Sequence, residues 1–260
     1  MTMNRFRPWA VLVLVASVVG VCLAAPDPQE LLATTDAIRN PGRPFAVKVT
    51  LTEFESGKRV DTSTLMNYSR PAEAGGQFTT LISFVEPARD SGKLLLREGN
   101  DLWFYDPSTK ASIRISPQQR LMGQAANGDV ITVNLAKDYE AVLKAEEEVM
   151  DGERRMRRSF KLALSARSPG ATYAAVELWV DAETSRPLRA KFFAESGHLL
   201  KTAFFRRYQS QLGRERPTET VIIDGLNPQS VTLMRFSDFT TPNLPAKWFQ
   251  RDNLSRFQPE

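Results

Sequence analysis

The sequence has little of what catalytic sites and disulfide frameworks are built from. Its 260 residues include one cysteine, Cys22, and one histidine, His198. Nucleophilic dyads, Ser-His-acid triads and zinc sites depend on these residue types. His198 directly follows Ser196-Gly197, so an exposed turn residue is its ordinary interpretation. There is no GxGxxG or GxxxxGK phosphate loop, and no carboxylate pair stands out among 30 acidic residues. We therefore expect no enzyme, no metal site and no cofactor.

A strong charge of one sign is also absent. The 34 basic and 30 acidic residues give a formal net charge of +4, and the sequence pI is near 9.3. Such a small excess is a weak argument for an acidic polymer as partner. We expect no nucleic-acid partner.

The N-terminus has the order of a secretory signal peptide. Arg5 and Arg7 precede an uncharged apolar stretch, Trp9 to Ala24, with small residues at Cys22 and Ala24. The stretch is shorter than the roughly 20 residues of a membrane-spanning helix. We expect cleavage of residues 1–24 and release of residues 25–260 into the periplasm. Lipid attachment to Cys22 is the alternative, disfavoured because Val21 stands where bacterial lipobox signals place Gly, Ala or Ser.

The rest of the chain has the sequence pattern of a single β domain. From Phe45 to Phe54 apolar and polar residues alternate, the period-two pattern of a half-buried strand, and similar runs separated by turns continue to Phe239. Helical spacing predicts a first helix over Pro28–Arg39 and a second in the middle, with Leu135, Tyr139, Val142 and Leu143 on one face. Residues 245–257 are expected to form a short helix or a docked tail.

These elements predict a mainly β (α+β) fold. About ten or eleven antiparallel strands would form one large curved sheet, an incomplete barrel, with the helices covering its inner face. We found no internal repeat or linker, so residues 25–260 are expected to form a single domain and a monomer.

Several predicted strands are apolar on both faces, which indicates that both faces are covered. A well-packed core would explain this; the functional alternative is a cavity for an apolar ligand. The pattern does not say which face points inward, so the residues adjacent to our candidates could line the cavity instead. The lipid-binding candidates are Phe84, Leu94, Leu96, Trp103, Tyr105, Trp179, Phe192 and Phe204.

The segment from Arg114 to Asn134 interrupts the regular series of strands. Connections of this length in compact domains are often lids or binding loops. Gly123 and Gly128 would let it bend, and its apolar residues would cover a cavity. The lid candidates are Leu121, Met122, Val130 and Ile131. A fixed structural insert is the alternative.

Particular runs resemble a known family. They are 102–107 (LWFYDP), 114–124 (RISPQQRLMGQ) and 127–130 (NGDV), with 178–184 (LWVDAET) further along the chain. They are similar to the outer-membrane lipoprotein-sorting proteins, a branch of the LolA-like superfamily, and the likeness extends over the whole mature chain.

The resemblance implies an unclosed antiparallel barrel around helices, with an apolar interior that accepts acyl chains. LolA ferries lipoproteins between the two membranes of Gram-negative bacteria. The expected cargo is therefore a lipoprotein or lipid, received from an inner-membrane transporter and delivered to an outer-membrane acceptor. A periplasmic sensory or adaptor domain that binds a membrane-protein partner is the alternative.

Overall fold

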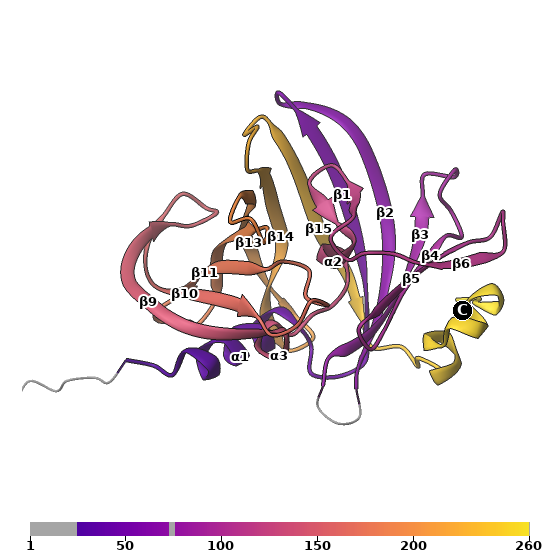
Figure 1. Cartoon of the computed structure of the whole chain (residues 1–260), viewed down its shortest axis with the longest axis horizontal. Helices are drawn as coiled ribbons and strands as arrows, with labels where there is room; N and C mark the ends of the chain where they lie inside the picture. Colours follow the sequence, from indigo (N-terminus) through magenta and orange to yellow (C-terminus); the bar gives the residue numbers. More distant parts are fainter. Residues whose placement is uncertain (1–24, 73–75, 260) are drawn as a thin grey trace, which may run out of the picture.

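The computed structural model describes residues 25–72 and 76–259, and the expected signal peptide lies outside them. One strongly curved antiparallel sheet of 13 strands forms most of the molecule (Figure 1). A separate hairpin consists of β7 (Arg120–Met122) and β8 (Ala125–Ala126). The strands of the large sheet are β1 (Phe45–Glu55), β2 (Lys58–Pro71), β3 (Phe78–Glu86), β4 (Leu94–Glu98), β5 (Asp101–Asp106), β6 (Ala111–Arg114), β9 (Tyr139–Met150), β10 (Met156–Ala166), β11 (Ala175–Asp181), β12 (Pro187–Phe193), β13 (Leu199–Gln211), β14 (Arg214–Asp224) and β15 (Ser230–Thr240).

The chain enters this sheet at its middle, through β1. From β1 it meanders outward to β6, crosses to the opposite edge at β9, and meanders back to β15, which pairs with β1. The outermost strands β6 and β9 do not pair with each other, so the sheet is not closed. The predicted unclosed antiparallel sheet is confirmed, with 13 strands rather than ten or eleven.

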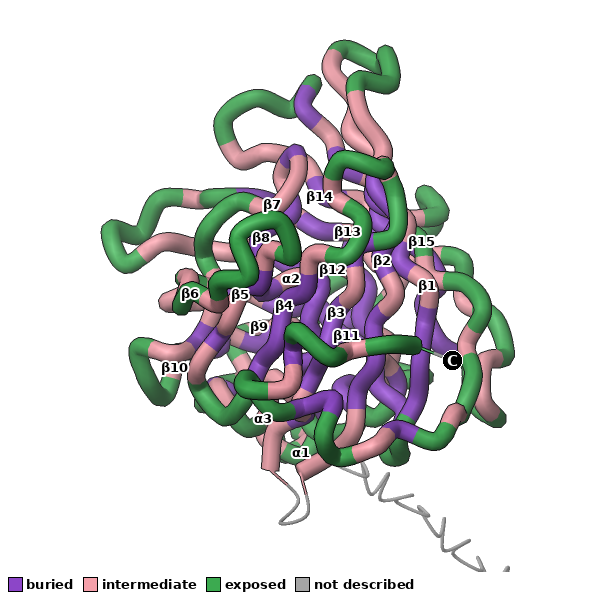
Figure 2. The backbone as a smooth tube through the Cα atoms, turned by 90° about the vertical axis from the view of Figure 1, so that its right-hand side faces the viewer, coloured by how far each residue is buried: buried purple, intermediate pink, exposed green. Residues whose placement is uncertain are grey.

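Alternation of side chains gives the sheet two different faces. On β1, Phe45, Val47, Val49 and Leu51 are buried on the concave inner face and belong to the largest hydrophobic cluster. Buried residues follow the middle of the strands, whereas most turns are exposed (Figure 2).

The C-terminal segment covers part of the outer face. The 3₁₀ helices η1 (Ala246–Phe249) and η2 (Arg251–Arg256) pack against β3, β4 and β5. Trp248 meets the ring of Tyr68 edge-on, with 5.5 Å between ring centroids. A docked tail is therefore present, and it explains why these strands are apolar on both faces.

The helix predicted at Pro28–Arg39 is confirmed as α1, with the same bounds. The Asp27 side chain accepts a hydrogen bond from the backbone N–H of Glu30 at 2.8 Å, and the proline sits in the first turn, where it costs no hydrogen bond. No helix in the described ranges is both long and apolar enough to cross a membrane.

The second predicted helix is wrong over most of its length. Only Leu135–Asp138 is helical (α3), and strand β9 begins at Tyr139. Tyr139 and Ala141 are buried while Glu140 and Val142 are exposed, so the strand period holds. Pairing of β9 with β10 along its length outweighs the helical spacing of the same apolar residues.

Candidate functional site

Residues 115–138 join the two free edges of the sheet, and we call them the cover segment. Because β6 and β9 lie at opposite edges, this connection spans the sheet, and its buried residues place it over the concave face. It contains the β7–β8 hairpin, α2 (Asn127–Val130) and α3. Figure 1 shows α2 between the two halves of the curved sheet. Val130, Ile131 and Val133 are buried in the inner-face cluster.

A cavity of about 140 Å³ lies between the cover segment and the inner face. Most of its wall is apolar, contributed by both halves of the sheet. Its apolar side chains are Phe45 and Val47 of β1, Val130, Ile131, Val133 and Leu135 of the cover segment, Val176 and Leu178 of β11, Ala190 and Phe192 of β12, Ala203 and Phe205 of β13, Ile222 of β14, and Met234, Phe236 and Phe239 at β15.

A buried ion pair stands in this apolar wall. The ammonium of Lys201, on β13, contacts the carboxylate of Asp129, on α2, and donates to the carbonyl of Gln124 at 3.2 Å. It also lies 4.8 Å from the centroid of the Tyr173 ring. The Tyr173 hydroxyl donates to the other oxygen of Asp129 at 2.9 Å. Burial, and next the charge of Asp129, hold the pKa of Tyr173 well above its usual value, so the hydroxyl keeps its proton.

Further polar contacts fasten the cover segment to the sheet. Asn67, on β2, donates its side-chain amide to the carbonyl of Val130 at 2.8 Å. The hydroxyls of Ser69 and Thr132 are 2.6 Å apart, and both residues are buried. At the end of α3, Asp138 pairs with the buried Arg97 at 3.5 Å. These hydrogen bonds fix the conformation of the cover segment. Each adds little net stability, because water can form the same bonds when the segment is detached from the sheet.

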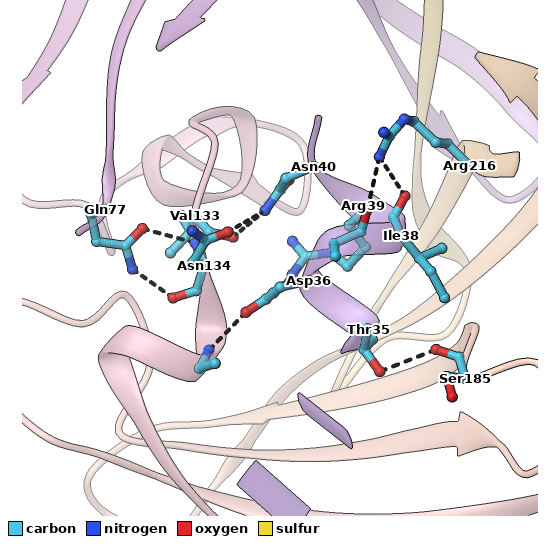
Figure 3. A network of polar contacts seen from close by, with 12 residues as sticks. Thr35, Asp36, Ile38, Arg39, Asn40, Gln77, Val133, Asn134, Ser185 and Arg216 are labelled. Atoms are coloured by element: carbon cyan, nitrogen blue, oxygen red, sulfur yellow. Dashed lines mark hydrogen bonds and ion pairs between the residues drawn. The ribbon is translucent and has the colours of Figure 1, made fainter. Parts of the chain in front are cut away.

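The end of α1 holds the other side of the cover segment (Figure 3). The side chain of Asn40 donates to the carbonyl of Val133 at 2.8 Å, and Asp36 accepts from the N–H of Ala136 at 2.8 Å. Gln77 exchanges two hydrogen bonds with the backbone of Asn134. Because Asp36 is buried, its pKa is raised, although the nearby Arg39 opposes this effect.

The cavity is small for a long acyl chain. An engineered cavity of about 150 Å³ in another protein holds one benzene molecule. A chain of roughly 15 carbons therefore does not fit the cavity in this conformation, and either the cover segment or the sheet must move to admit one.

The comparisons with known proteins agree with this architecture. The LolA superfamily protein NE2245 from Nitrosomonas europaea is 33% identical; the match covers 88% of this chain and 99% of that one, with a TM-score of 0.78. The present chain belongs to the LolA superfamily. A family model described only as an uncharacterized protein matches residues 76–256.

Two further structures share the LolA-like fold. One is a DUF1329 family protein from Desulfovibrio piger, 22% identical, with a TM-score of 0.73 over 87% of this chain and 97% of that one. The other is a putative outer membrane lipoprotein-sorting protein domain from Vibrio parahaemolyticus, 20% identical, with a TM-score of 0.72 over 88% and 98%. The search of curated proteins gave no match.

The structure separates the eight lipid-binding candidates by face. Phe192 lines the cavity between the cover segment and the inner face. Phe84 also points inward, but it lies in a neighbouring groove of about 410 Å³, edge-on to Phe104. Leu95 and Leu102, beside candidates on β4 and β5, belong to the inner-face cluster but do not line the cavity.

The other six candidates face away from the cavity. Leu94, Leu96, Trp103 and Tyr105 pack beneath the C-terminal tail. Trp179 forms a small outer cluster with Val149 and Leu188, and the guanidinium of Arg189 lies 4.0 Å from its ring centroid. Phe204 alternates with the inward-facing Ala203 and Phe205, so it points outward.

The lid candidates all belong to the cover segment but lie in two places. Val130 and Ile131 line the cavity, whereas Leu121 and Met122 line the neighbouring groove. Whether the segment moves stays a prediction.

Sequence reasoning missed the polar groups of the cavity, Lys201, Asp129, Tyr173 and Asn67. One signal was available. Lys201 shares a face of β13 with Ala203 and Phe205, and a lysine buried on that face must have a partner for its charge. Its partner, 72 residues away in sequence, had no such signal.

Proposed function

We propose that this protein is a periplasmic carrier that binds the acyl chains of a lipoprotein or lipid and moves it between the inner and outer membranes. The observation that carries the proposal is the apolar cavity enclosed between the sheet and the cover segment. Most of its lining is apolar, and polar groups gather beside Lys201 and at the Asn40 end.

A carrier is physically necessary for such cargo. Each CH₂ group exposed to water costs about 0.8 kcal/mol, so a chain of roughly 15 carbons stays in its membrane unless a protein shields it. Shielding requires a concave apolar surface with a cover, and release requires that the cover be held by reversible contacts. The contacts of Asn67, Ser69 and Asn40 with the cover segment are of that kind.

In this proposal loading displaces the cover segment. The two edges of the sheet could separate without breaking a strand pairing, because β6 and β9 are not hydrogen-bonded to each other. A chain would then occupy the space of Val130 and Ile131 as well as the cavity. The relatives support the choice of cargo, since the Vibrio protein is described as a lipoprotein-sorting domain and the family is the LolA superfamily. An inner-membrane transporter as donor and an outer-membrane acceptor complete the proposal.

Native mass spectrometry of the protein purified from its own periplasm tests the function. We expect a co-purifying lipid or acylated peptide that transfers to liposomes. A stoichiometric protein partner with no lipid would instead favour a sensory or adaptor domain and would contradict the carrier.

A further inference from the structure

A cleft of about 600 Å³, separate from the cavity and the groove described above, opens beside the end of α1. Four cationic side chains line it: Arg43, Lys137, Arg214 and Arg216. Arg43, Lys137 and Arg214 are exposed at its rim, and Arg216 is 4% exposed at its base.

Within the described residues, no carboxylate forms an ion pair with any of these four cations. The partners of the arginines are neutral carbonyls. Arg216 donates to Ile38 at 2.8 Å (Figure 3), and Arg214 donates to Ala37 at 3.1 Å. Arg43 donates one hydrogen bond, to the carbonyl of Leu212 at 3.1 Å. The end of α1 supplies a partial charge of roughly −0.5, far less than the cations gathered around it.

The carboxylate that does line the cleft is already used. One oxygen of Asp36 accepts a hydrogen bond from the Arg39 guanidinium, and the other accepts one from the N–H of Ala136. Burial, and next the neighbouring Arg214 and Arg43, lower the pKa of Arg216 to about 10, so it stays charged at neutral pH beside two like charges. Among the described residues, the cleft therefore offers no unpaired carboxylate, and guanidinium groups with free N–H donors suit the oxygens of a phosphate.

The cleft adjoins the apolar cavity. Asn40 lines both, and its hydrogen bonds to Val133 and Asn134 form part of the wall between them (Figure 3). An amphiphile with its chain in the cavity could therefore place its head group in the cleft once these two bonds open.

We propose that the cargo is an anionic lipid whose phosphate-bearing head group binds Arg43 and Arg214 in this cleft while its chain occupies the cavity. This inference rests on the proposed function and narrows it to a class of cargo. Arg216 forms the positive base of the site, and Lys137 adds a fourth charge at the rim.

The test compares two probes with the same acyl chain, a lysophosphatidic acid and the corresponding uncharged monoacylglycerol. Calorimetry of the delipidated mature protein measures both affinities. We expect the phosphate-bearing probe to bind about tenfold more tightly, the gain of one charge-assisted hydrogen bond or more. The double variant Arg43→Gln/Arg214→Gln should lose this preference and still bind the monoacylglycerol normally. The matched control Arg59→Gln/Arg256→Gln removes the same charge from exposed positions and should keep the preference.

Equal binding of the two probes, or a preference that survives in the double variant, would overturn the head-group site and leave the carrier intact. Failure of both probes to bind would instead count against the carrier. Inorganic phosphate is the third arm. If it binds as tightly as the lysophosphatidic acid and is not displaced by it, the cleft is a free-phosphate site and the proposal is wrong.

Discussion

The Lys201 ammonium and the Asp129 carboxylate meet inside an apolar cavity, one from the sheet and the other from the cover segment. Both side chains are at most 10% exposed. A buried pair of this kind adds little net stability, but removing one partner leaves an uncompensated charge. We therefore expect the pair to fix where the cover segment sits more than to stabilise the fold.

Replacing one partner should loosen the cover. Asp129→Asn leaves Lys201 buried without a counter-charge, which costs about 3–5 kcal/mol. We expect a lower free energy of unfolding and faster hydrogen exchange across residues 125–134. The double variant Asp129→Asn/Lys201→Met removes both charges and should regain part of the loss. Equal destabilisation of the single and double variants would show that the pair is not coupled.

Mobility of the cover can be tested with a covalent lock. The Ser69 and Thr132 hydroxyls are 2.6 Å apart, a separation that brings their Cβ atoms near the range a disulfide requires. A chain cleaved after Ala24 has no other cysteine. We expect oxidised Ser69→Cys/Thr132→Cys to stop loading lipid and to recover on reduction, while either single variant loads throughout. Normal loading by the oxidised form would establish the cover as a fixed insert.

Tryptophan emission should be a poor reporter of the wild-type cavity. Trp103 and Trp248 pack together with the tail and Trp179 lies in the outer cluster, all on the outer face. Lipid should therefore change the emission of the mature protein little, whereas Phe192→Trp places an indole in the cavity wall and should give a clear shift. A large shift in the wild type that Phe192→Trp does not increase would put the ligand on the other face.

Strand β4 shows why the sequence assigned outward-facing residues to the cavity. Leu94, Leu95 and Leu96 are all buried, because the cover lies on one side of the strand and the C-terminal tail on the other. Alternation tells which residues share a face but not what covers it. By contrast, α1 was predictable to the residue because Asp27, Pro28 and Pro41 mark its ends locally. The Lys201–Asp129 contact depends on a long-range arrangement that no local pattern encodes.

Acid should weaken the sheet at Glu219, which is fully buried and receives hydrogen bonds from Arg206 and Arg235. Burial alone would raise its pKa, but these bonds hold it below the usual 4.5. Its contribution is therefore complete above about 4.5 and is lost as the pH falls through the lowered pKa.

Glu219→Gln should lower the free energy of unfolding by about 2 kcal/mol at neutral pH. In urea titrations, the difference from the wild type should shrink toward pH values below the usual pKa of glutamate. Glu215→Gln, on the same strand, breaks an exposed pair with Arg186 and should cost under about 1 kcal/mol. A Glu219→Gln effect that does not change with pH would contradict the lowered pKa.

The cavity itself is tested most directly by filling it. Ala203, on β13, is buried in the cavity wall, and its neighbour Thr202 points to the opposite face. Lipid affinity should be measured for Ala203→Leu and Thr202→Leu, with thermal unfolding as a check that both fold. We expect Ala203→Leu to weaken binding at least about tenfold, a change of about 1.4 kcal/mol, and Thr202→Leu to bind like the wild type. Normal binding by a folded Ala203→Leu variant would show that the acyl chain does not occupy this cavity.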